Sequence, residues 1–248
     1  MKKIAIYTVL TGGYDQLQQP SVTDDRFDYI CFSNDIPKEN IGLWKIRKFD
    51  GHYPSKQIES RYPKMHPWVV LPEYDYSVYM DANISIVSKD FYEHIIKKIE
   101  SGATLSGIKH PFRDCCYTEG YTVFTYNLER FFTVVKAMRF LRKEGFPRHY
   151  GMYEANIILR KHSDARVQQQ CELWWNMLNR FSKRDQLSYP YTLWKEDIPF
   201  DYLLPETENA RNCPWLHMEQ HVRKKNIWGK KLKRIGRFVY RKLVGYGK

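Results

Sequence analysis

The feature that most constrains the fold of this chain is the alternation of short apolar runs with longer amphipathic segments. Runs rich in β-branched and aromatic residues occupy positions 3–10, 27–32, 43–49, 75–87, 103–108 and 154–161. Such runs are typical of buried strands. Helical periodicity follows at 88–99, 128–145 and 163–181. The alternation predicts an α/β fold with a mostly parallel central sheet, which binds its ligands at the carboxyl ends of the strands.

Charge divides the chain into two unequal parts. The 248 residues carry a formal net charge of +12, with 40 Lys and Arg against 28 Asp and Glu. Residues 221–248 hold 11 of these bases and no acid, so the other 29 bases nearly balance the 28 acids. We therefore expect one domain over residues 1–220 and a basic tail over 221–248. A nearly neutral body argues against a nucleic-acid-binding protein, although the basic tail keeps that alternative open.

The tail has the pattern of an amphipathic helix. Its apolar positions recur at steps of three or four residues and are Trp228, Leu232, Ile235, Val239 and Leu243. Lys and Arg fill the flanks, which is typical of a helix that lies on an anionic membrane surface. The alternative is a helix packed on the body with its charges in solvent, because the glycines of the tail weaken an isolated helix.

Two features indicate a reducing compartment and no membrane span. The five cysteines include no CxxC pair and are odd in number, so they cannot all form disulfides. No apolar run approaches the roughly 18 residues of a spanning helix, and the first run reads as a strand rather than a signal peptide. We expect a cytoplasmic protein, held peripherally at the cytoplasmic face of a membrane by its tail.

The sharpest local motif is Asp81-Ala82-Asn83, which ends the apolar strand pattern YSVYM. Residues i and i+2 of an extended chain project to the same side, so Asp81 and Asn83 can present oxygen atoms to one hard cation. Such a cation neutralises the charge of a departing diphosphate. On spacing alone the motif is a weak signal, because Asp-x-Asn after a strand is more often an ordinary turn.

A resemblance to a known family gives this motif a context. It is carried, in order along residues 4–195, by YTVLTGGYDQL, RYPKMHPWVVLPEYDYSVYMDANISI, HPFRDCCYTEG, GMYEANIILRKHSD and KRDQLSYPY. These blocks resemble a family of domains regarded as glycosyltransferases, long catalogued as a domain of unknown function. The family occurs in bacterial surface-polysaccharide clusters and in plant polysaccharide synthesis, and it is similar to the GT-A class with its Rossmann-like fold. The resemblance implies a nucleotide-sugar donor, a lipid-linked or polysaccharide acceptor, and a DxD motif that holds Mn²⁺ or Mg²⁺.

The resemblance assigns the donor side to residues of three blocks. Asp81 and Asn83 take the DxD positions, with Asn in place of the second Asp, so the metal is expected to bind more weakly. The loop after the first strand is expected to hold the nucleotide, and Arg61 and Lys64 precede the metal strand, where a base contacts the donor diphosphate. The expected donor-binding residues are Thr8, Thr11, Gly12, Arg61, Lys64, Asp81 and Gln186.

Candidates for the catalytic carboxylate and for a further metal ligand come from later blocks. Transfer through an oxocarbenium-like state needs a carboxylate, for which Asp185 and Glu154 are the candidates. Each also has a structural explanation, Asp185 as a helix cap and Glu154 as an exposed charge at a strand end. His217 is the expected third metal ligand, with His110 and His221 as alternatives. A domain that binds nucleotide sugars without catalysis also stays possible, because Asn83 departs from the motif.

Overall fold

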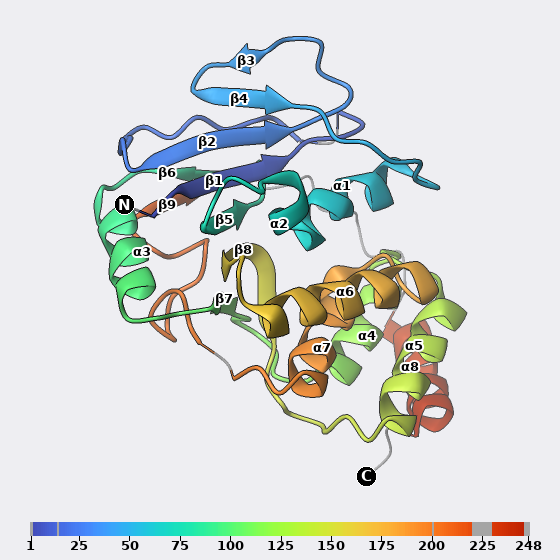
Figure 1. Ribbon diagram of the computed structural model, residues 1–248. Helices are drawn as coiled ribbons and strands as arrows, with labels where there is room; N and C mark the ends of the chain where they lie inside the picture. The colour runs from blue at the N-terminus through green and yellow to red at the C-terminus, as the bar shows by residue number, and fades with distance from the viewer. Residues whose placement is uncertain (1, 14, 200, 220–229, 246–248) are drawn as a thin grey trace.

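The protein is built around one seven-stranded sheet. The computed structural model describes residues 2–13, 15–199, 201–219 and 230–245. In spatial order the strands are β3 (Asn40–Ile41), β4 (Trp44–Arg47), β2 (Phe27–Phe32), β1 (Ile4–Val9), β5 (Tyr76–Met80), β8 (Tyr153–Lys161) and β7 (Leu105–Lys109). The predicted α/β fold is confirmed, and the strand patterns found in the sequence correspond to these elements (Figure 1).

The sheet is mixed, which corrects the prediction of a mostly parallel one. Strands β4, β2, β1 and β5 run parallel, whereas β8 is antiparallel to both β5 and β7, and β3 is antiparallel to β4. The β8 sequence is buried along nearly all its length, so its apolar run does not encode direction. The carboxyl end of β5 lies beside the first half of the antiparallel strand β8, where Met80 pairs with Ile157. Directly after β5, the N–H group of Asp81 donates to the carbonyl oxygen of Asn156 over 2.9 Å.

Two apolar layers cover the sheet. On one face, α3 (Asp90–Glu100) and a two-stranded sheet of β6 (Ile84–Ile86) and β9 (Leu216–Met218) pack against Ile6 and Val78. On the other face, α1 (Lys56–Met65), α2 (Pro67–Val70) and α6 (Ala165–Arg180) cover Tyr7 and Tyr79. Both layers are needed because the strands of this sheet are apolar on both faces.

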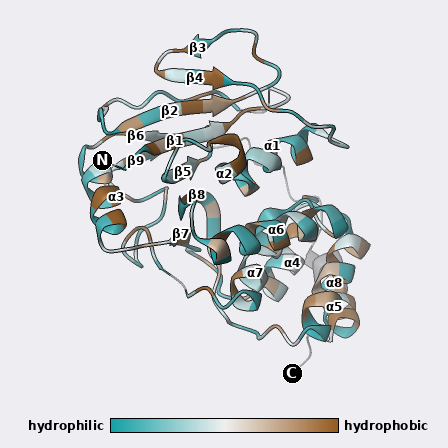
Figure 2. Ribbon diagram, viewed as in Figure 1, coloured by the Kyte–Doolittle hydropathy of each residue, from teal (hydrophilic) through white to brown (hydrophobic). Residues whose placement is uncertain are grey.

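A third cluster is largely helical and also includes Met177 of α6. It joins α4 (Cys116–Thr125), α5 (Phe131–Lys143), α7 (Tyr189–Lys195) and α8 (Lys230–Val244), beside the short 3-10 helix η1 (Asp185–Leu187). Figure 2 shows hydrophobic and hydrophilic residues alternating along α3 and α5, as expected for helices with one buried side. Helix α4 has no counterpart among the helical patterns found in the sequence. Two apolar residues at the start of the predicted helix over 128–145, Leu128 and Phe132, are 39% and 77% exposed. Helix α5 begins only at Phe131, so the periodicity predicted from Leu128 starts one turn too early.

The C-terminal helix α8 packs against α4 and α5. One predicted apolar position of the tail, Trp228, lies outside the described residues. The alternative metal ligand His221 also lies outside them. Within the part of the chain that the structure describes, no helix has the length and apolarity needed to cross a bilayer.

Candidate active site

The motif residues Asp81 and Asn83 lie where β5 ends, between β1 and β8. Oδ1 of Asp81 accepts a hydrogen bond of 2.7 Å from the hydroxyl of Tyr79, which fixes the carboxylate orientation. Asn83 is 3% exposed, and its Nδ2 donates to the carbonyl oxygen of Glu219 over 2.7 Å. Its Oδ1 is buried and has no hydrogen-bond partner among the described residues.

Two further side-chain oxygens without partners lie on the neighbouring strands. They are Oγ1 of Thr8 on β1 and Oδ1 of Asn156 on β8, each in a residue less than a tenth exposed. Buried polar atoms without partners are rare in proteins, and each one calls for an explanation such as a bound ion, water or ligand. Three such oxygens lie on β1, on β8 and directly after β5.

Beneath this edge, Lys64 and Asp185 form a buried ion pair. Nζ of Lys64 lies 2.8 Å from Oδ2 of Asp185, and Nε of Arg61 lies 3.6 Å from the same oxygen. Burial alone would raise the pKa of Asp185, but Arg61 and Lys64 outweigh it and hold that pKa well below its usual range. Burial lowers the pKa of Lys64, and Asp185 and Asp81 oppose that shift. With Asp185 fully ionised beside two cations, we assign the pair its charged form.

The ion pair is connected to the metal motif through Tyr79. The ammonium group of Lys64 lies over the Tyr79 ring, 4.5 Å from its centroid, and the Tyr79 hydroxyl donates to Asp81. Burial and the charge of Asp81 raise the pKa of Tyr79 well above its usual value, so the hydroxyl keeps its proton. The structure thus brings together four residues singled out in the sequence, Asp81, Lys64, Arg61 and Asp185. Lys64 is only 1% exposed, however, so it acts on this site from beneath.

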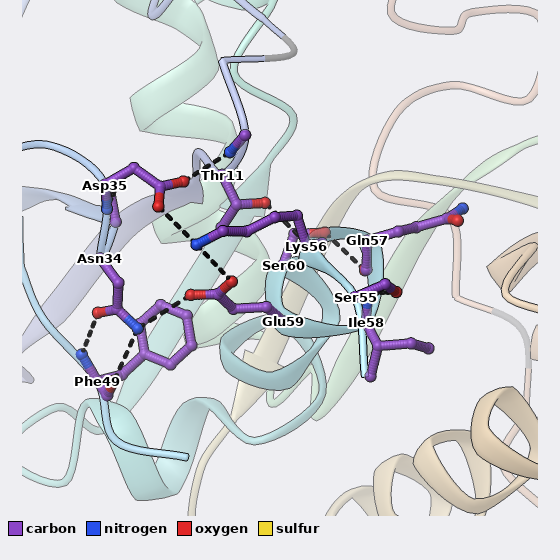
Figure 3. A network of polar contacts seen from close by, with 12 residues as sticks. Thr11, Asn34, Asp35, Phe49, Ser55, Lys56, Gln57, Ile58, Glu59 and Ser60 are labelled. Atoms are coloured by element: carbon purple, nitrogen blue, oxygen red, sulfur yellow. Dashed lines mark hydrogen bonds and ion pairs between the residues drawn. The ribbon is translucent and has the colours of Figure 1, made fainter. Parts of the chain in front are cut away.

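A second polar network lies at the ends of β1 and β2 (Figure 3). The N–H group of Gly12 donates to Oδ2 of Asp35 over 2.6 Å, and Nζ of Lys56 lies 2.5 Å from Oδ1 of Asp35 and 2.9 Å from Oε2 of Glu59. Thr11 donates its hydroxyl to the carbonyl oxygen of Lys56 over 2.9 Å. Gly12 has φ of +66°, a conformation that glycine adopts at low cost. These contacts tie the predicted nucleotide loop to the start of α1.

Glu154 is the second carboxylate candidate. Its side chain is buried, which corrects the alternative that it is an exposed charge at a strand end. Its Oε1 lies 2.5 Å from Nη1 of Arg211, and its Oε2 accepts from Nδ2 of Asn156 over 3.1 Å. Since the backbone of Asn156 bonds to Asp81, Glu154 lies near the metal motif on the β8 side. Gln186 is half-buried in η1, and its N–H group donates to Oδ1 of Asp185 over 3.1 Å.

The histidines are more dispersed. His217 is exposed on β9 and its Nε2 lies 3.1 Å from Oε1 of Glu219, the residue whose carbonyl oxygen accepts from Asn83. His110 is buried, and burial together with Arg113 and Arg211 lowers its pKa to about 4. His221 lies outside the described residues. Across the described ranges, no three His, Cys, Asp or Glu side chains are grouped closely enough to hold a metal.

Several residues of the site were not singled out from the sequence. Tyr79 was taken only as part of a strand, although its place two residues before Asp81 puts both side chains on one side. Asp35 and Lys56 were also missed. Asp35 follows the strand Phe27–Phe32, so the reasoning applied to Asp81 also identifies it. Arg211 carries no local pattern, because it reaches Glu154 across 57 positions.

Comparison with known proteins identifies the family. Residues 1–213 match the family model described as TOD1/MUCI70, glycosyltransferase-like domain. The chain belongs to this family. The match covers the sheet, the metal motif, Asp185 and Arg211, and it ends before the basic tail. The TOD1/MUCI70 membership confirms the resemblance found in the sequence. Among curated proteins, none matches this one in sequence.

Two solved structures are similar to this TOD1/MUCI70 domain. One is the apo structure of the bifunctional glycosyltransferase WbbM, with 9% identity, a TM-score of 0.44, and coverage of 77% of this chain. This chain spans only 37% of WbbM. The other is the galactosyltransferase LgtC in complex with donor and acceptor sugar analogues, with 10% identity and a TM-score of 0.47. That likeness covers 98% of this chain and 95% of LgtC.

Proposed function

We propose that this glycosyltransferase-like domain is an active, metal-dependent enzyme that transfers a sugar from a nucleotide-diphosphate donor. The observation that carries the proposal is the buried, unpartnered Oδ1 of Asn83 beside the Asp81 carboxylate at the end of β5. Together with the family membership, this pair supports a donor site at the carboxyl ends of β1 and β5.

The residues present suit Mn²⁺ or Mg²⁺. Asp81 offers the oxygen that Tyr79 leaves free, and Asn83 offers an amide oxygen that has no other described partner. Both are hard oxygen ligands, and Mg²⁺ is commonly held by one or two protein groups together with substrate phosphates. The metal would neutralise the developing charge of the departing nucleoside diphosphate. His217 remains our proposed third ligand. It lies on β9 two residues before Glu219, whose carbonyl oxygen accepts the hydrogen bond from Nδ2 of Asn83.

The surrounding residues have distinct proposed tasks. The loop with Thr11 and Gly12, held by Asp35 and Lys56, forms the nucleotide side of the site, where Thr8 also presents its free hydroxyl oxygen. Arg61 provides positive charge toward the diphosphate from α1, and Gln186 reaches the donor from η1.

The two carboxylate candidates differ in environment. Asp185 is ionised between Lys64 and Arg61, and a carboxylate with so low a pKa is a weak base. We therefore propose that Asp185 acts mainly by positioning Lys64, and that Glu154 is the better candidate for the carboxylate at the reacting sugar. Its Oε2 faces Asn156, next to the metal motif.

The proposed acceptor is lipid-linked or a polysaccharide, in surface-polysaccharide synthesis at the cytoplasmic face of a membrane. Family membership supports the sugar chemistry. The basic, acid-free tail supports a location at an anionic surface.

A panel of nucleotide sugars, with and without Mn²⁺, tests the proposal by two readouts, thermal stability and donor hydrolysis. A donor that binds only the folded state at about 100 times its Kd adds about 2.7 kcal/mol of stability. Asp81→Ala is expected to abolish hydrolysis and the Mn²⁺-dependent stabilisation, and Asn83→Ala to weaken both. Asp25→Ala, at an exposed aspartate, is the control and should retain both.

Three outcomes would contradict parts of the proposal. Full activity of wild type in excess chelator would exclude the metal. Unchanged turnover of Asp81→Ala would exclude the assigned site. Donor binding without hydrolysis or transfer would mean that the domain binds nucleotide sugars but does not use them, which is the alternative raised by Asn83.

A further inference from the structure

One side of helix α8 is locked onto the catalytic domain. Tyr240 and Val244 are each 1% exposed, and the Tyr240 hydroxyl donates to the carbonyl oxygen of Tyr117 in α4 over 2.7 Å. Gly120 makes room for this ring, because a Cβ atom there would lie 2.5 Å from the Tyr240 hydroxyl oxygen. The helix is therefore seated on α4 by one specific side.

The C-terminal end of α8 is also fixed. Nη1 of Arg142 donates to the carbonyl oxygen of Val244 over 3.1 Å, and Nη2 of Arg148 donates to that of Gly245 over 3.0 Å. The last carbonyl groups of a helix have no partners within the helix and carry partial negative charge, so two guanidinium groups stabilise this end. The helix is attached as a rigid part of the domain over its last two turns.

The opposite side of α8 is apolar and exposed. Its large apolar residues there are Ile235, Phe238, Val239 and Leu243, with exposures of 53%, 68%, 39% and 40%. Steps of three and four residues place them on one side of a helix. Exposed apolar residues clustered in this way indicate an interaction surface.

Helix α8 is also strongly basic. In sequence, α8 contains Lys230, Lys231, Lys233, Arg234, Arg237, Arg241 and Lys242 and no acidic residue. Among its described side chains, Arg241 and Lys242 are exposed, whereas the guanidinium of Arg237 lies over the ring of Tyr121 in α4, 4.9 Å from its centroid. A second copy of the same helix would bring like charges together, which argues against self-association through it. Exposed apolar side chains on a basic helix instead fit the boundary between headgroups and acyl chains of an anionic bilayer.

We propose that the outer face of α8 binds an anionic lipid bilayer while its inner face stays locked on α4 and α5. The membrane then holds the catalytic domain in one orientation, because the helix is not a loose tether. In Figure 1, α5 and α8 lie on the side toward which β1, β2 and β4 point, the side of the proposed donor site. Only the link to a lipid-linked acceptor rests on the proposed function, and the bilayer contact stands independently.

Vesicle sedimentation of the full-length protein tests this contact without donor, metal or acceptor. The probes are vesicles of phosphatidylcholine alone and of phosphatidylcholine mixed with phosphatidylglycerol, at low and high salt. Phe238→Ser should weaken binding to the anionic vesicles by about tenfold, the scale of one phenyl ring removed from an apolar contact. Phe112→Ser is the matched control, because Phe112 is 76% exposed elsewhere on the protein.

The charge component has its own matched pair. Lys242→Glu should weaken binding by about fivefold or more, since each base near an anionic surface contributes about one fivefold step. Lys97→Glu, on the exposed part of α3, should not weaken it. All four positions are exposed, and unchanged thermal unfolding will verify that the variants are folded. Failure of wild type to bind anionic vesicles, or equal losses in both members of a pair, would overturn the proposal. So would tight duplex DNA binding that Lys242→Glu weakens but Phe238→Ser leaves intact, which would indicate nucleic acid as the partner.

Discussion

The ammonium group of Lys64 and the carboxylate of Asp185 pair over 2.8 Å although 121 positions separate them in the sequence. The pair joins α1 to η1 below the metal motif and is almost fully buried. Removing two charges from water is costly, so such a pair is tolerated only while both partners are present.

Asp185→Asn is therefore expected to destabilise the fold by about 3 kcal/mol, because it leaves Lys64 buried without its counter-charge. The double variant Lys64→Met with Asp185→Leu should recover most of that loss. Chemical unfolding measures both. Unchanged stability in Asp185→Asn, with turnover reduced by about a hundredfold or more, would instead make Asp185 the catalytic base.

Tyr79→Phe is expected to lower Mn²⁺ affinity by about tenfold or more, because groups that orient a metal ligand contribute on that scale. The variant removes the hydroxyl that donates to Asp81. Tyr189→Phe is the matched control, since the Tyr189 hydroxyl is buried and has no described partner. Calorimetric titration of Mn²⁺ in the presence of nucleoside diphosphate compares them. Equal affinities in the two variants would remove Tyr79 from the metal site.

Stability is expected to fall as the pH drops from about 6.5 to about 4, through the buried histidines. Burial, with Arg160 nearby, lowers the pKa of His162 to about 4. Between pH 6.5 and about 4 the unfolded chain binds a proton at His162 that the folded chain does not bind. The contribution of neutral His162 to the free energy of unfolding is therefore complete above pH 6.5 and is lost progressively as the pH falls through this window. Over this whole window a single histidine accounts for up to about 3 kcal/mol. The melting temperature of His162→Gln should therefore fall less between pH 7 and pH 5 than that of wild type, and parallel decreases would contradict the assignment. Asp185, with its lowered pKa, acts only at lower pH.

Gly120→Ala is expected to destabilise the protein, although alanine in a helix is otherwise favoured over glycine by about 1 kcal/mol. The added Cβ would clash with Tyr240 and also approach Val134 and Met138 at 3.1 Å. Adding Tyr240→Phe removes the clashing oxygen and should restore part of the stability, and tryptic cleavage within α8 should follow the same order. A Gly120→Ala protein as stable as wild type would contradict the packing of α8.

The sequence predicted the elements better than their arrangement. Patterns over 27–32 and 154–161 match β2 and β8 closely. The direction of β8 could not be predicted, because a strand buried on both faces has the same composition in either orientation. Helix α4 was missed because Gly120 and its threonines disfavour a helix, and only the packing with Tyr240 explains the glycine.

The site was predicted in part for a similar reason. Strand ends are visible in sequence, so Asp81 and the loop of Gly12 were found. Partners that come from distant segments were not, as Arg211 illustrates for Glu154. Burial also changes the expected role of a residue, since Lys64 has the sequence pattern of a donor contact but lies beneath the edge it was expected to occupy.

The antiparallel pairing of β8 with β7 has a consequence for how this fold tolerates insertions. The N–H group of His110, just after β7, donates to the carbonyl oxygen of Met152, just before β8, over 2.9 Å. The forty residues or so between them leave and rejoin the sheet at one point, and closing a longer loop there adds only about 0.6 kcal/mol for each doubling of its length. We therefore expect changes in the length of this connection, which carries α4 and α5, to leave the pairing of β7 with β8 intact.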